Sequence, residues 1–159
     1  MTDQHVQAAL NQAAQDFLTA NASITTVADG VISGLPTITA ADIGWENRKF
    51  KPTGKATWAS VFYVPNTPNA TTLGKTGSDE MTGFLQIDIN AANDSGEDTH
   101  RAWFKKSRLY FHGGRVFTYT GQNVIVTSSG MSQGRHSDGF FRKSITVNFR
   151  AQLKRPQLA

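Results

Sequence analysis

The sequence predicts an α+β domain, in which a mainly antiparallel β-sheet is flanked by two α-helices. Two segments place apolar residues at helical spacing, and several others alternate apolar and polar residues as half-buried strands do. The order is one helix, strands, a second helix and further strands, which is typical of the α+β class. The length of 159 residues fits one core, so we expect a single domain over residues 1–159.

The first helix is expected from Thr2 to about Ala20. Its apolar stripe has a helical period and should close one side of the sheet. The residues of this stripe are Val6, Ala9, Leu10, Ala13, Ala14, Phe17 and Leu18. The following segment, 23–41, is rich in Thr and Gly and predicts an irregular connection with a short strand.

The middle of the chain predicts strands separated by a long polar loop. Apolar and polar residues roughly alternate over 43–52, and residues 57–64 are aromatic or β-branched on both faces, which predicts a strand covered on both sides. Residues 65–80 form a polar loop suited to binding or assembly. Residues 81–90 alternate as a strand, in which Gly83 marks a bulge or a close backbone approach.

A second helix is expected to begin at Ser95 as its N-cap and to stop before Gly113. One face of this helix is expected to be core, and it holds Trp103, Phe104, Ser107, Tyr110 and Phe111. A basic stripe lies on another face, formed by Arg101, Lys105, Arg108 and His112. Such a stripe is a solvated face, a protein interface or a nucleic-acid surface.

The C-terminal part predicts a hairpin and one long strand. Residues 116–120 and 123–128 form the hairpin around Gly121 and Gln122, and residues 130–139 follow as a second loop. Residues 141–153 alternate regularly, with one apolar and one polar face. This strand should lie in a sheet that is packed on one side and open on the other.

Composition excludes several classes of function. The chain has no cysteine, which excludes disulfides, thiolate zinc sites and thiol catalysis. Residues 1–100 hold 5 basic and 11 acidic residues, a net charge of −6, whereas residues 101–159 hold 11 basic and 1 acidic, a net charge of +10. The two signs either mix in the folded chain or form separate surfaces that meet between copies or face nucleic acid.

The residue patterns that resemble catalytic motifs are weak. His136, Ser137 and Asp138 are adjacent, so their side chains do not converge as a nucleophilic relay requires. Gly74-Lys75-Thr76 lacks the first glycine and the strand-to-helix context of a phosphate-binding loop. The four histidines are scattered. We therefore expect no enzyme activity, no cofactor and no metal site, and, without a signal peptide or a membrane span, a soluble cytoplasmic chain.

Several short motifs in a fixed order resemble the tail terminator proteins of long-tailed bacteriophages. They are Trp45-x-Asn47-x-x-Phe50-x-Pro52, Gly83-Phe84-Leu85-Gln86-Ile87-Asp88, Gly96, Phe111-His112-Gly113-Gly114 and the strand Ile145 to Arg150. The resemblance extends over about residues 3–153. Beside it, we expect Trp45, Phe50 and Trp58 to be core residues and Asn47 to be a turn residue.

The resemblance implies a virion protein, assembled in the host cytoplasm, that forms a ring of usually six copies on the end of the tail tube. The ring stops polymerisation of the major tail protein and presents a surface to the head-completion proteins, while DNA passes through without specific binding. The candidate interface residues are Arg101, Lys105, Arg108, Arg142 and Arg150. The alternatives are another head–tail connector protein, or a nucleic-acid-binding module that stacks bases on Trp103, Tyr110 and Phe111.

Overall fold

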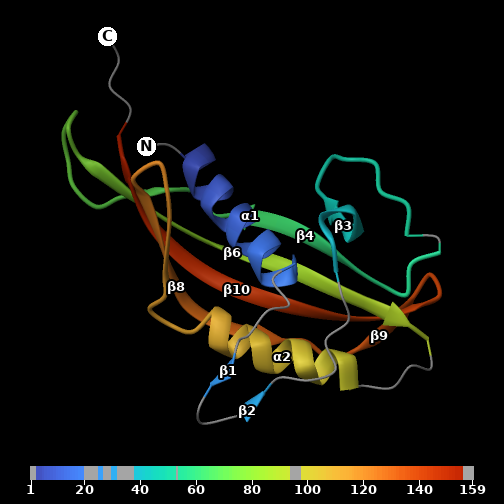
Figure 1. Ribbon diagram of the computed structural model, residues 1–159. Coiled ribbons are helices and arrows are strands. Elements are labelled where there is room, and N and C mark those ends of the chain that lie inside the picture. The colour runs from blue at the N-terminus through green and yellow to red at the C-terminus, as the bar shows by residue number, and fades with distance from the viewer. Residues whose placement is uncertain are drawn as a thin grey trace.

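The fold is an eight-stranded, strongly curled sheet with two helices on its concave face (Figure 1). The computed structural model describes residues 3–19, 25–26, 30–31, 38–52, 54–93 and 98–155. The helices are α1 (Asp3–Thr19) and α2 (Asp98–Tyr110), with a short 3-10 helix at Ala40–Asp42. The strands are β1 (Thr25–Thr26), β2 (Gly30–Val31), β3 (Ile43–Trp45), β4 (Thr57–Pro65), β5 (Asn69–Ala70), β6 (Ser78–Ala92), β7 (Val116–Tyr119), β8 (Gln122–Met131), β9 (Arg135–Ser137) and β10 (Phe140–Lys154).

The sheet has the order β3-β4-β6-β10-β8-β7, with β5 added to β6 and β9 added to β10. Its centre is the antiparallel pair of β6 and β10, which runs from Ser78 opposite Lys154 to Ala92 opposite Phe140. β3 pairs with β4 in parallel, and the other pairs are antiparallel. The predicted α+β class and the mainly antiparallel sheet are therefore confirmed.

The core lies between the concave face of the sheet and α1. All seven apolar residues predicted for the stripe of α1 are buried. Opposite them, β6 contributes Leu85, Ile87 and Ile89, and β10 contributes Ile145 and Val147, all fully buried. The alternation predicted for residues 141–153 is confirmed, because every second residue from Ile145 to Leu153 is buried. The polar residues between them lie on the opposite face, which we call the outer face of the sheet.

Three of the expected elements differ in the structure. The strand expected over 43–52 covers only Ile43–Trp45, because the chain turns at Asn47, where φ is 56°. The loop expected over 65–80 contains β5 and the first residues of β6. The loop expected over 130–139 contains β9, and a tight turn at Asp138 and Gly139, with φ of 51° and 85°, leads into β10.

β4 is covered on both sides only in its first half. Trp58 is 7% exposed and packs against Phe50 and Phe140, with ring centroids 5.0 and 5.6 Å away. Phe62 and Val64, on the outer face, are 37% and 38% exposed. The expectation of a strand covered on both sides is wrong for this half, since no described element lies over these two side chains.

The remaining expectations are met in part. Trp45 and Phe50 are half-buried, and Asn47 occupies the expected turn. The hairpin of β7 and β8 turns at Thr120 and Gly121, one residue earlier than expected. The expected N-cap, Ser95, lies outside the described residues. α2 ends at Tyr110, and Gly114 adopts a φ of 88° shortly after it.

Gly83 marks a close backbone approach, as the sequence predicts. A Cβ atom at this position would lie 2.5 Å from the carbonyl oxygen of Val64 and 2.8 Å from the Cα atom of Pro65. Backbone atoms of the paired strand cannot move away without disturbing the ladder between β4 and β6. Only glycine therefore fits at position 83.

We predict that Gly83→Ala lowers the free energy of unfolding by about 1–3 kcal/mol, because the added methyl group overpacks the strand pair. Gly130→Ala is the matched control, since Gly130 also lies in a strand and a Cβ there meets nothing within 4 Å. Urea denaturation of both variants measures the difference. Equal midpoints for the two variants would contradict this reading of the Gly83 contact.

Candidate functional site

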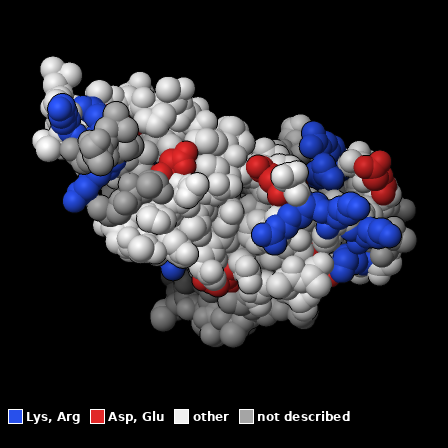
Figure 2. All heavy atoms as spheres, turned by 90° about the horizontal axis from the view of Figure 1, so that it is seen from above, with Lys and Arg blue, Asp and Glu red and all other residues white. Residues whose placement is uncertain are grey.

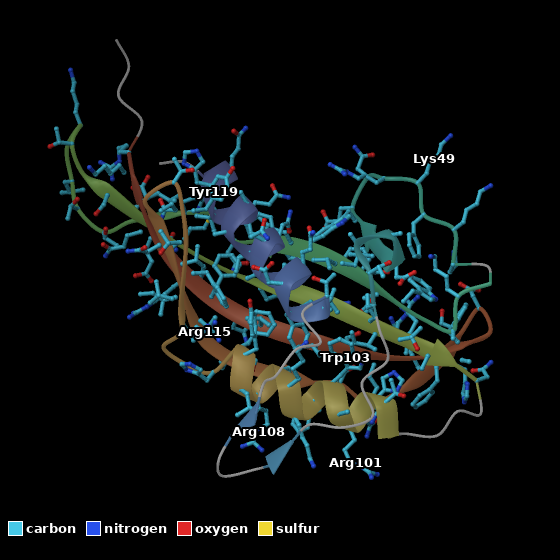
Figure 3. The ribbon with its side chains drawn as sticks, viewed as in Figure 1. Lys49, Arg101, Trp103, Arg108, Arg115 and Tyr119 are labelled. Carbon is cyan, nitrogen blue, oxygen red and sulfur yellow. The ribbon has the colours of Figure 1, made fainter. Side chains whose placement is uncertain are left out.

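α2 separates its side chains into a buried and an exposed face. Of the five residues expected on the core face, Trp103, Ser107 and Phe111 are fully buried, whereas Phe104 and Tyr110 are half-buried. Arg101, Lys105 and Arg108 are exposed, and we call these three residues the α2 basic stripe. Figure 3 shows Arg101 and Arg108 pointing away from the sheet and Trp103 pointing toward it. The helix therefore presents a row of cations on the outside of the molecule.

The buried face of α2 is joined to α1 by an aromatic cluster centred on Phe17. The Phe17 ring centroid lies 5.3 Å from that of Trp103, 5.6 Å from that of Tyr110 and 5.0 Å from that of Phe111. Tyr110 is half-buried, and burial raises its pKa. These three rings pack in the core, so they do not form the base-stacking platform that the nucleic-acid alternative requires.

Lys106 is a buried charged residue that the sequence analysis did not single out. It is 1% exposed, and its Nζ donates a hydrogen bond to the carbonyl oxygen of Phe17 at 2.5 Å. The same atom lies 5.3 Å from the Phe17 ring centroid and 5.1 Å from that of Trp103. Burial lowers the pKa of Lys106 to about 8. A cation thus meets a carbonyl in the last turn of α1, where the helix dipole favours positive charge.

The five predicted interface residues do not form one patch. Arg142 and Arg150 lie on β10 and face the outer side of the sheet, away from α2. Arg142 is half-buried, its Nε donates to Asn90 Oδ1 at 2.7 Å, and it lies 3.9 Å from Asp88 Oδ2. Arg150 is exposed. The structure therefore brings Arg101, Lys105 and Arg108 together and places the other two residues in a different layer.

Ion pairs connect the acidic N-terminal part of the sequence to the basic C-terminal part. Arg142 pairs with Asp88, and Arg155 pairs with Asp79 at 2.7 Å, so both ion pairs join the basic C-terminal part to the acidic N-terminal part. Asp88 is 2% exposed and also accepts hydrogen bonds from Gln86 and Ser144. These two pairs neutralise part of the charge asymmetry, and the α2 basic stripe adds three exposed basic residues on a separate surface.

A second group of cations lies at the opposite side of the molecule. Arg48, Lys49 and Lys51 follow β3 and are all exposed. We call them the basic loop patch, and Figure 2 shows basic side chains gathered at this end of the upper face. The net negative charge of residues 1–100 hides this group, although three basic residues within four positions would have indicated a local basic patch.

The residues that resemble catalytic motifs lie in ordinary turns and packing contacts. His136 Nδ1 lies 2.9 Å from Asn93 Oδ1, and its ring packs on Phe141 with centroids 5.2 Å apart. Gly74 and Lys75 lie in the turn between β5 and β6, which leads into a strand and not into a helix. Within the described ranges, no group of three or more metal-binding side chains comes together. Nor does any described helix have the length and apolarity needed to cross a bilayer.

The comparisons with known proteins agree with this architecture. The model of a family described as phage tail terminator protein matches residues 23–149, a range that starts before the separate pair of β1 and β2 and ends within β10 of the eight-stranded sheet. Six chains of solved structures match. One of them superposes with a TM-score of 0.66 over 98% of this chain and 99% of its own length, at 17% sequence identity, which shows a shared fold alone. No curated protein matches the sequence.

We predict that Lys106→Met changes how stability depends on pH. Between pH 8 and the ordinary lysine pKa of 10.5, the unfolded chain holds a proton at Lys106 that the folded chain releases, so the free energy of unfolding rises with pH. Relative to Lys106→Met, the wild type should gain about 3 kcal/mol at most over this range. The test is the slope with pH and not the stability at pH 7, since methionine removes the buried charge and also the hydrogen bond to the carbonyl oxygen of Phe17.

Chemical denaturation of both proteins from pH 7 to 10.5 measures this difference. Burial also raises the pKa values of Tyr63 and Tyr110, but these residues are common to both proteins and cancel in the comparison. Parallel pH profiles for wild type and variant would show that Lys106 keeps an ordinary pKa in the folded chain.

Proposed function

This chain belongs to the phage tail terminator protein family, and from that premise we propose that it closes the end of the tail tube as a ring of its own copies, with six the expected number. As a member of this family it is a component of the virion tail. In the proposed role the ring stops further addition of the major tail protein and offers a surface to the head-completion proteins. The protein acts by fitting against its neighbours, with no bond made or broken.

The observation that carries the proposal is the family match over residues 23–149. The matched region contains all of α2 and most of the sheet, so it includes the α2 basic stripe. A closed ring requires two different patches of one subunit to meet. A row of like charges on one patch favours an acidic partner surface and disfavours pairing of two identical patches.

We therefore propose that the α2 basic stripe lies at a contact with a neighbouring subunit or with the tube. A lumen lined by this stripe would bind DNA phosphates and hinder passage of the genome, since each cation adds to a salt-dependent affinity. Of the other predicted interface residues, Arg150 remains an exposed candidate on the outer face. Arg142 serves the fold, since it is held by Asn90 and Asp88.

We predict that the triple variant Arg101→Glu, Lys105→Glu and Arg108→Glu folds normally but no longer caps tubes. All three residues are exposed, so thermal stability should change little, whereas each interface contact becomes repulsive. The matched control is Arg48→Glu, Lys49→Glu and Lys51→Glu, which changes the net charge equally in the basic loop patch. Electron microscopy of tail assemblies measures tube length and density at tube ends.

Tubes of uncontrolled length with the stripe variant, and tubes of normal length with the control, are the expected results. If both variants cap tubes as the wild type does, the stripe is not the interface. If the wild type itself leaves tube length unregulated and shows no density at tube ends, the terminator role is wrong for this chain.

A further inference from the structure

β7 is an open edge of the eight-stranded sheet. It is the last strand in the order β3-β4-β6-β10-β8-β7, and among the described strands only β8 pairs with it. Its sequence, Val116-Phe117-Thr118-Tyr119, has high β-propensity and contains no charge and no proline. Figure 3 shows Arg115 and Tyr119, at the two ends of this strand, along one side of the molecule. An edge of this kind is a template for pairing with another chain.

The hairpin with β8 determines which backbone groups of β7 are free. The carbonyl oxygen of Arg115 accepts a hydrogen bond from Val126 N at 2.8 Å, so the backbone polar groups of Arg115 face β8. Such groups alternate along an antiparallel strand, so those of Phe117 also face β8. The N–H and C=O groups of Val116 and Thr118 therefore point away from the sheet. They have no hydrogen-bond partner in the part of the chain that the structure describes.

The opposite edge of the sheet is poorly suited to pairing. Its outermost strand, β3, has only three residues and lies beside residues 59–61 of β4. Beyond β3 the edge of β4 is short of donors, because Tyr63 N already donates to Glu46 Oε1 at 2.7 Å and Pro65 has no N–H. Pairing of β7 with this edge of another copy would therefore leave backbone groups of β7 unpaired.

A second copy of β7 satisfies all four free groups. We propose that two β7 strands pair antiparallel across a two-fold axis, with Val116 of each copy opposite Thr118 of the other copy. Phe117 then lies opposite its own counterpart at the axis. Each pair of Val116 and Thr118 exchanges two N–H···O=C bonds, so four hydrogen bonds form and no outward-facing group of Val116 or Thr118 remains free.

The side chains are compatible with this register. Val116 is 49% exposed and meets Thr118 of the second copy, which forms a favourable pair of β-branched residues. Tyr119 is 43% exposed and lies opposite Arg115 of the second copy. The Cζ atom of Arg115 already lies 5.1 Å from the ring centroid of Phe117, so a guanidinium held in place faces an exposed aromatic ring. The contact covers two exposed apolar side chains and places no like charges directly opposite each other.

This contact goes beyond the proposed function and does not depend on it. A contact across a two-fold axis is isologous, whereas a ring is closed by heterologous contacts. The pairing of β7 can join two free chains, or two rings face to face, but it does not add a subunit within one ring. The protein should therefore self-associate in solution without any tail tube.

Disulfide trapping tests the pairing and its register, because the natural chain has no cysteine. The Cα atoms of a hydrogen-bonded antiparallel pair lie about 5.5 Å apart, within the range that a disulfide bridges. Under mild oxidation, a mixture of Val116→Cys and Thr118→Cys proteins should give more cross-linked dimer than either protein alone. Lys105→Cys, exposed on α2, replaces Thr118→Cys in the control mixture and should not link to Val116→Cys. No link above this control, or stronger links within one variant than in the mixture, overturns the proposal.

Val116→Lys gives an independent readout without cysteine chemistry. Lysine on an edge strand opposes pairing, and each dimer loses two covered valines, so the dissociation constant in analytical ultracentrifugation should rise about tenfold or more. Val64→Lys is the matched control, since Val64 is 38% exposed on the outer face of β4 and should leave this constant unchanged. Both side chains are partly exposed, so thermal melting should show both variants folded. Equal dissociation constants for the two variants, or a wild type that is monomeric at about 1 mM, overturns the proposal.

Discussion

The pairing of β6 with β10 is the constraint on which the rest of the structure depends. The two strands are paired continuously from Ser78 opposite Lys154 to Ala92 opposite Phe140. Because side chains alternate along both strands, this pair alone divides the molecule into a helix-covered face and an outer face. β4 then adds to β6 and β8 adds to β10, so every other position in the sheet is fixed relative to this pair.

The sequence predicts the structure well where an element is buried on one side, because apolar residues then recur with the period of a helix or a strand. The apolar stripe of α1, the two faces of α2 and the alternation of β10 are all visible in the sequence, because each element is buried on one side only. The same reasoning identified Arg101, Lys105 and Arg108 as exposed. The family resemblance was carried by short motifs, and those within the described residues lie on β3, the turn at Asn47, β6, the segment after α2 and β10.

The remaining features depend on contacts between distant residues, which no local pattern contains. β5 and β9 are short and polar, and they are strands only because β6 and β10 offer partners. Residues 57–64 have the composition of a strand covered on both sides, but Phe62 is buried only if another element packs over the outer face there. Lys106 resembles its basic neighbours in sequence, yet it is buried because α1 places Phe17 over it. Arg142 and Arg150 are positively charged like the α2 basic stripe, but they lie on β10 in a different layer.

The location of the α2 basic stripe is determined by the core and not by the charges themselves. Adjacent residues on a helix are separated by about 100°, so a rotation of α2 by one position could place Lys105 at the buried position of Lys106 and move Trp103 to the half-buried position of Phe104. The Phe17 cluster and the hydrogen bond from Lys106 to α1 prevent this rotation. A change at the contact between α1 and α2 would therefore move the whole stripe, whereas substitutions among the surface cations leave that contact in place. If the stripe has the interface role proposed above, stability and recognition depend on different residues of one helix.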